Sequence, residues 1–173
     1  MGKQIGVLDG GIAAWRSAGK PTTATATPTA ARGTWTPRPR EEAIISAAGL
    51  RDHLGHEGVV VLDARKPDEY IGAAAEDGVA RGGHIPTAKN LDWTLTMNDG
   101  AFKPAAEIRR LFADQGVKPG DRVVTYCRVG TRASVLYFAA KMLGYDAVMY
   151  DGSMVDWSRR TELPVVKGPN PGQ

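Results

Sequence analysis

Cysteine is nearly absent from this sequence of 173 residues, and long apolar runs are absent altogether. Because Cys127 is the only cysteine, no internal disulfide can form, and no cluster of Cys and His supplies the ligands of a zinc site. No stretch approaches the roughly 18 apolar residues of a membrane span, and no cationic segment followed by an apolar one resembles a signal peptide after Met1. We therefore expect a cytoplasmic protein that needs neither a metal nor a membrane.

An excess of charge of one sign is also lacking. The 22 Lys and Arg residues outnumber the 19 Asp and Glu residues only slightly, and neither a Lys/Arg run nor an interleaved aromatic stripe occurs. Proteins that bind nucleic acids concentrate positive charge on one surface. The sequence therefore gives no support to a nucleic-acid partner. Its length allows one full domain with additional material.

The one cysteine begins a six-residue segment, residues 127–132, between an apolar strand and an apolar helix. Residues 122–126 are β-branched and aromatic, whereas residues 135–143 repeat apolar side chains at helical spacing. This order predicts a strand, a tight loop and a helix. Unpaired N–H groups at the start of a helix favour an anion such as a thiolate. Arg128 and Arg132 add positive charge that favours a thiolate and attracts an anionic substrate.

A lone cysteine is more often a small buried apolar residue than a nucleophile. In this chain its neighbours are two arginines and a glycine, residue types that favour exposed turns over a core. We therefore predict that Cys127 is a nucleophile and that Arg128 and Arg132 bind an anion. Main-chain N–H groups complete the predicted cradle, and they belong to Val129, Gly130 and Thr131. Alternatively, Arg132 points outward and pairs with an acid at the helix start.

Residues 7–15 and 149–157 read like two copies of one segment, with an Asp-Gly pair and a Trp at matched positions. The copies lie about a domain length apart, and a proline follows each. We therefore predict that residues 1–23 are the remnant of an earlier domain, so that any targeting signal lies upstream. Residues 24–42 are rich in Thr, Ala, Pro and Arg, which predicts an extended, exposed linker.

The remaining sequence predicts a catalytic domain over residues 43–167 and a short tail over residues 168–173. Residues 59–63 form an apolar run too short for a helix, which indicates a buried parallel strand. Helices are predicted over 46–54, after Pro104 and after the Cys127 loop, and further strands over 122–126 and 147–150. The alternation predicts an α/β fold with an open parallel sheet of five strands and helices on both faces. Ligands bind such sheets beyond the carboxyl ends of the strands.

Four motifs follow one another along the predicted catalytic domain. They are residues 61–65 with Glu69 and Tyr70, residues 83–90, residues 127–132, and Asp151-Gly152 leading to Trp157. With these motifs the chain resembles the rhodanese (thiosulfate sulfurtransferase) family, specifically its members with two tandem domains. The resemblance covers most of residues 44–165, and residues 1–23 resemble the tail of the non-catalytic first domain.

The resemblance implies that the Cys127 thiolate takes the outer sulfur of thiosulfate, releases sulfite, and passes the persulfide sulfur to cyanide or another thiophilic acceptor. It implies no cofactor, and the implied partners are the anionic sulfur donor, the acceptor and the missing rhodanese-like first domain. Mercaptopyruvate enzymes of the family typically carry a Cys-Gly-Ser-Gly-Val-Thr loop, whereas this loop has two arginines, which suit a dianion. Thiosulfate is therefore the predicted donor, and 3-mercaptopyruvate is the alternative.

Other polar residues of the motifs allow both a functional and a structural interpretation. Arg65 and Glu69 are four residues apart, would pair on a helical turn, and in the family look structural, near the pocket wall. Asp63 either faces the site or caps the next turn. His84 can serve as a base, but a hydrogen bond that braces its turn is the commoner role. Trp93 either lines the substrate opening or packs in the core.

Two other functions compete with a sulfurtransferase. Phosphatases and arsenate reductases of this fold also hold an oxyanion between a Cys and an Arg, but their loop is one residue longer, and Ala133 occupies that position here. The shorter loop disfavours phosphoryl chemistry. A non-catalytic interaction or regulatory module is the second alternative, although such modules often lack the cysteine that this chain has.

Overall fold

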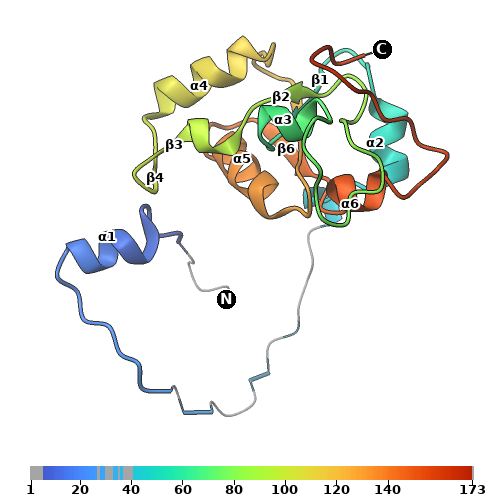
Figure 1. Cartoon of the computed structure of the whole chain (residues 1–173). Coiled ribbons are helices and arrows are strands. Elements are labelled where there is room, and N and C mark those ends of the chain that lie inside the picture. The colour runs from blue at the N-terminus through green and yellow to red at the C-terminus, as the bar shows by residue number, and fades with distance from the viewer. Residues whose placement is uncertain (1–5, 27, 30–32, 35, 37–40, 173) are drawn as a thin grey trace.

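The computed structural model describes residues 6–26, 28–29, 33–34, 36 and 41–172. A parallel sheet of four strands has the order β2-β1-β5-β6 and lies between two layers of helices (Figure 1). The strands are β1 (Val59–Asp63), β2 (Lys89–Asn90), β5 (Arg122–Tyr126) and β6 (Asp146–Met149). The helices are α1 (Gly11–Ser17), α2 (Ala47–His53), α3 (Pro67–Tyr70), α4 (Ala105–Asp114), α5 (Thr131–Met142) and α6 (Ser153–Trp157). Two short 3-10 helices, Glu41–Ala43 and Trp93–Thr96, and the hairpin of β3 (Met97–Asn98) and β4 (Ala101–Phe102) complete it.

The predicted α/β fold with an open parallel sheet is confirmed, but the predicted count of five strands is wrong. Ile44 pairs with Met149 through an isolated parallel bridge beside β6, where a fifth strand would lie. The segment cannot extend this pairing, because a 3-10 helix ends at Ala43 and Ser46 already caps α2 by accepting a hydrogen bond from the N–H of Gly49 at 3.1 Å. One paired residue is too short for a strand.

Two apolar cores cover the two faces of the sheet. Side chains alternate along a strand, so neighbouring residues of β1 and β5 enter different cores. Leu62 and Val123 join α4 and α5 in one core, whereas Val61 and Val124 join α2 and α6 in the other. This double burial explains why β1 reads as a continuous apolar run instead of an alternating one.

The two copies of the repeated segment have different surroundings. Met154 and Trp157 of α6 are fully buried, whereas Ile12 and Trp15 of α1 are 58% and 39% exposed. Figure 1 shows α1 apart from the sheet, on the side where β4 lies. The Asp9 carboxylate accepts a hydrogen bond from the N–H of Phe102 at 2.9 Å.

The described residues of the predicted linker between 24 and 36 are all exposed and lie in no helix or strand, whereas its last two residues, 41 and 42, are not extended and belong to the 3-10 helix Glu41–Ala43. The rest of that linker up to residue 40, residues 1–5 of the predicted remnant and residue 173 of the tail lie outside the described residues. The division into domains stays a prediction. Across the described part of the chain, every helix is too short or too polar to traverse a lipid bilayer.

Candidate active site

The loop that follows β5 places Cys127 beyond the carboxyl end of the sheet, as predicted. Gly130 turns the chain into α5 with a φ of 88°, a left-handed conformation that glycine adopts without strain. A Cβ at this position would also lie 3.1 Å from the carbonyl oxygen of Asp151. Among the described residues, no acceptor pairs with the main-chain N–H groups of Val129, Gly130 and Thr131. These N–H groups are therefore available to an anion.

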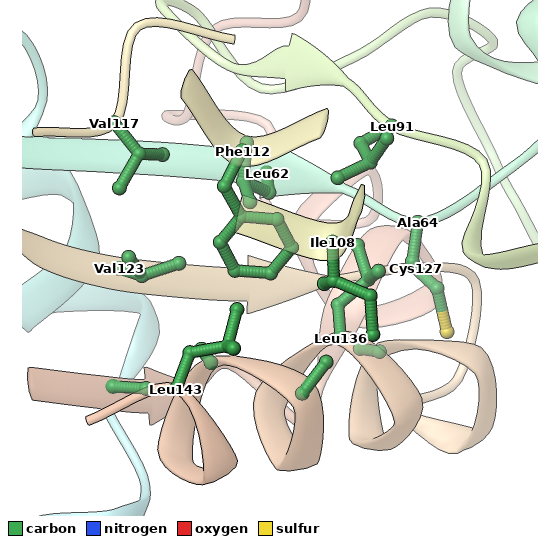
Figure 2. Close-up of a cluster of buried hydrophobic side chains, with 14 residues drawn as sticks. Leu62, Ala64, Leu91, Ile108, Phe112, Val117, Val123, Cys127, Leu136 and Leu143 are labelled. Carbon is green, nitrogen blue, oxygen red and sulfur yellow. The ribbon is translucent and has the colours of Figure 1, made fainter. Parts of the chain in front are cut away.

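The Cys127 side chain is fully buried, which contradicts the expectation that its polar neighbours keep it out of the core. Figure 2 shows its sulfur beside the first turn of α5 and close to Ala64. The cause is the alternation of β5, because Cys127 continues the face of Val123 and joins the same core. The thiol is therefore closed off from solvent in this conformation.

Ser153 supports the Cys127 main chain, and sequence reasoning missed it. Its hydroxyl accepts a hydrogen bond from the N–H of Cys127 at 3.1 Å and donates one to the carbonyl of Tyr150 at 3.0 Å. Ser153 has a φ of 52°, a left-handed conformation that is rare for a serine. The sequence repeat pointed to this position, because the residue matched to Ser153 in the first copy is a glycine, Gly11. Gly11 also has a left-handed φ, of 55°. A serine where the other copy has a glycine, at a left-handed position, indicates that the serine hydroxyl is needed for hydrogen bonding.

Arg132 lies inside a cluster of carboxylates. Its guanidinium donates to both carboxylate oxygens of Glu69 at 2.6 and 3.0 Å and to Glu76 at 3.2 Å. The expected pairing of Arg65 with Glu69 is therefore wrong. The physical reason is that α3 begins only at Pro67, so Arg65 lies outside the helix on which a four-residue spacing would bring the two side chains together.

Arg65 instead joins the far side of the same cluster, where it is fully buried. Its Nε and Nη2 donate to the Asp63 carboxylate, the latter at 2.6 Å, its Nη1 pairs with Glu76, and its Nη2 also reaches the carbonyl of Gly83 at 2.8 Å. Asp63 also accepts a hydrogen bond from the N–H of Arg65 at 3.0 Å. Of the two roles predicted for Asp63, it has the local one and braces the turn after β1.

The cluster perturbs the ionisation of its members. Burial disfavours the charge of Glu69, but the hydrogen bonds from Arg132 and from the Lys66 N–H, together with the charge of Arg132, outweigh it and lower its pKa to about 2. Burial and the neighbouring Glu69 carboxylate raise the pKa of Glu76, against the attraction of Arg65. Burial works against the charge of Arg132, yet the hydrogen bond and the charge of Glu69 outweigh it and raise the Arg132 pKa. Arg132 therefore stays charged beside Cys127.

Arg128 makes fewer contacts with the described part of the protein than Arg132 does. Its side chain is 35% exposed, donates to the carbonyl oxygen of Asp77 at 2.9 Å, and lies 3.9 Å from the fully exposed Asp77 carboxylate. Val129, the next residue, is 46% exposed. Arg128 and Val129 thus form the outer surface of the loop. Sequence reasoning missed Glu76 and Asp77, which lie in an irregular segment without a recognisable pattern.

His84 and Trp93 have structural surroundings. The His84 ring is buried and stacks on Tyr70 at a centroid distance of 3.8 Å. Its Nδ1 and Nε2 lie 2.9 and 3.1 Å from the carbonyl oxygens of Tyr70 and Asn170, and burial lowers its pKa. These contacts brace the turn, whereas half-buried Trp93 packs against the core that includes Cys127. Among the described residues, no group of three His, Cys, Asp or Glu side chains is placed to hold a metal.

Comparisons with known proteins agree with this geometry. A family model described as a Rhodanese-like domain matches residues 46–160, which is more than half of the chain. A protein named thiosulfate sulfurtransferase from Corynebacterium glutamicum is 39% identical over 122 residues, which cover 65% of this chain and 40% of that protein. The sulfur carrier protein TtuD of Thermus thermophilus is 36% identical, with 96% of this chain and 62% of that protein covered. The chain thus spans less than two thirds of the length of these relatives.

Solved structures show the same fold. The anaerobic ergothioneine biosynthesis enzyme of Chlorobium limicola, in complex with trimethyl histidine, matches with a TM-score of 0.85 at 26% identity. This match covers 93% of the present chain and 41% of the enzyme chain. A structure of EanB that carries a cysteine persulfide, in a tetrahedral intermediate state with ergothioneine, matches with the same score and identity.

Proposed function

Because this chain belongs to the rhodanese-like domain family, we propose that it is a sulfurtransferase in which Cys127 carries the transferred sulfur as a persulfide. One observation carries the proposal: the only cysteine of the chain directly precedes the N–H groups at the start of α5, which have no acceptor in the described part of the chain. Such groups favour the thiolate that attack requires, and the neighbouring arginines add positive charge. The relatives named thiosulfate sulfurtransferase support the same chemistry.

The proposed reaction has two balanced steps. The Cys127 thiolate attacks the outer sulfur of thiosulfate, so that a new S–S bond forms on Cys127 while the S–S bond of thiosulfate breaks. Sulfite leaves with the electron pair of that bond, and the N–H groups with Arg128 compensate its charge. A thiophilic acceptor such as cyanide then attacks the outer persulfide sulfur, forms thiocyanate and restores the thiolate. No proton needs to be moved in either step, so no His base is required.

Thiosulfate is the proposed donor, and 3-mercaptopyruvate is the second candidate. Glu69 already pairs with Arg132, so the dianion first meets Arg128 and the N–H groups of the loop. The names of the relatives favour thiosulfate. Steady-state turnover of the purified protein with both donors decides between them, and a large preference for 3-mercaptopyruvate would overturn the choice of donor.

We also propose that a rhodanese-like domain packs against α1 and the exposed face of α5. The support comes from an apolar hollow of about 430 Å³ that lies between residues 7–11, the β3–β4 hairpin and α5. Phe138 of α5 is 38% exposed in this hollow, and α1 has no buried residue although its copy α6 is buried. The match to TtuD covers 96% of this chain, α1 included, but only 62% of that longer protein, which leaves room for a further domain.

Mass spectrometry after incubation with thiosulfate, without reducing agents, tests the sulfurtransferase. We expect one added sulfur atom on the wild-type protein, none on Cys127→Ser, and loss of the added atom when cyanide is supplied. An intact, folded wild-type protein that gains no sulfur would contradict the enzyme and favour a non-catalytic module. Hydrolysis of p-nitrophenyl phosphate that disappears in Cys127→Ser would favour a phosphatase.

A further inference from the structure

The charged cluster beside Cys127 contains one carboxylate more than it has arginines. Three acids, Asp63, Glu69 and Glu76, face two arginines, Arg65 and Arg132. Asp63 pairs with Arg65 through two guanidinium nitrogens, and Glu69 pairs with Arg132 in the same way. Glu76 bridges the two arginines as a third, surplus anion. If Glu76 leaves, each arginine therefore keeps a carboxylate partner, and no buried positive charge is left alone.

Glu76 also belongs to a segment that contacts both ends of the catalytic loop. Residues 73–78 lie in no helix or strand, and they run from the contact of Glu76 with Arg132 to the contact of Arg128 with the carbonyl of Asp77. Beyond this point Gly78 lies beside Val155 of α6. The segment therefore lies against both arginines of the loop whose thiol is fully buried. A sulfur donor has to reach that thiol, so some neighbouring segment has to move.

We propose that Glu76 is a positioning residue that occupies Arg132 as an internal anion and holds residues 73–78 over Cys127, so that the anionic sulfur donor has to displace it. The inference rests on the proposed function of Cys127 and adds a determinant of donor affinity. Glu76 is the member of the cluster best suited to leave. Its pKa is raised by burial and by Glu69, whereas the pKa of Glu69 is lowered, so the charge of Glu76 is the less stabilised of the two carboxylates that contact Arg132.

Alkylation of Cys127 tests this proposal without any sulfur chemistry, and the single cysteine makes the product unambiguous. Iodoacetate is anionic and iodoacetamide is neutral, so the ratio of their rates reports the charge at the site, and each rate reports access. In Glu76→Gln we expect both rates to rise and the ratio of iodoacetate to iodoacetamide to increase about threefold. Glu107→Gln is the matched control, because it removes the same charge from an exposed position of α4 away from the loop and should change the ratio by less than about twofold.

Steady-state kinetics then connect the residue to the reaction. The KM for thiosulfate should fall about threefold in Glu76→Gln while kcat changes little, because the donor no longer competes with a carboxylate. A purely structural role would lower kcat and thermal stability together. Rates and a rate ratio that stay at wild-type values in a folded Glu76→Gln protein would overturn the proposal, and so would a Cys127 that is alkylated in neither protein. A lack of thiosulfate turnover with the expected alkylation would overturn the proposed reaction alone.

Discussion

Arg128 and Arg132 are the two cations of one short loop, yet their surroundings differ. Arg132 is 23% exposed and forms a bidentate ion pair with Glu69 in addition to its contact with Glu76. Arg128 is 35% exposed, and its one hydrogen bond to the described part of the protein goes to a carbonyl oxygen. The Arg132 guanidinium is already bound by carboxylates of the protein, whereas the Arg128 guanidinium has N–H donors that are available to a ligand. The same residue type thus builds the loop at one end and is available to a ligand at the other.

The comparison locates the positive charge that an incoming anion meets. Within the cluster, two arginines and three carboxylates leave a net negative charge, so Arg132 presents little attraction at a distance. Arg128 and the free N–H groups at the start of α5 carry the attraction instead. An anion that approaches Cys127 therefore meets Arg128 first, and it reaches Arg132 only by competing with carboxylates that are already in place.

Removal of Arg132 should have the largest effect. In Arg132→Ala, Glu69 loses the arginine with which it forms a bidentate pair, so we expect the free energy of unfolding to fall by about 2–3 kcal/mol and sulfur transfer to fall at least about tenfold. Urea denaturation and turnover with thiosulfate measure the two effects, and Arg132→Lys should restore only part of each because lysine cannot bind a carboxylate bidentately. Arg122→Gln is the control, because it breaks an exposed pair with Asp146 and should cost less than about 1 kcal/mol. Equal losses in the two variants would erase the distinction between committed and exposed arginines.

Removal of Arg128 should affect binding and leave folding intact. In Arg128→Ala we expect the KM for thiosulfate to rise about tenfold, equivalent to about 1.4 kcal/mol, with kcat within about twofold of wild type. The midpoint of urea unfolding should stay near the wild-type value, because the lost side chain is partly exposed and its partner is a carbonyl. An unchanged KM would show that Arg128 does not hold the donor.

Local sequence patterns were sufficient for most of the fold. The apolar run of β1, the cap at Ser46 and the strand-loop-helix order around Cys127 each depend on neighbours in the chain, and each was predicted. The fifth strand failed because the pairing of Ile44 with Met149 stops after one residue, a limit set by the helix that follows. The burial of Cys127 was readable in principle, since the residue continues the period-two alternation of β5.

The charged cluster could not be predicted in the same way. Glu69 and Arg132 come from α3 and α5, far apart in the sequence, so their contact depends on how the whole domain packs. Glu76 lies in an irregular segment where no periodicity indicates which way its side chain points. The sequence motifs identified which charged residues belong to the site, but only the tertiary structure shows which carboxylate pairs with which arginine. The incorrect pairing of Arg65 with Glu69 arose because the four-residue spacing implied that both lie on one helix, whereas α3 begins only after Arg65.

The Glu69–Arg132 pair should also make the stability of the protein depend on pH in acid. This effect should be smaller than that of either substitution. The pKa of Glu69 in the folded protein is about 2, below its ordinary value of 4.5. Its stabilising contribution is therefore present above pH 4.5 and is lost as the pH falls toward 2. By linkage the loss at pH 4 is less than about 1 kcal/mol, and Glu76 opposes it, because a raised pKa means that the folded state takes up that proton more readily. Urea unfolding at pH 6 and pH 4 should show a smaller loss of stability in Glu69→Gln than in wild type. Glu107→Gln on the exposed face of α4 should keep the wild-type pH dependence, and equal losses in wild type and Glu69→Gln would mean that the Glu69–Arg132 pair contributes nothing to stability.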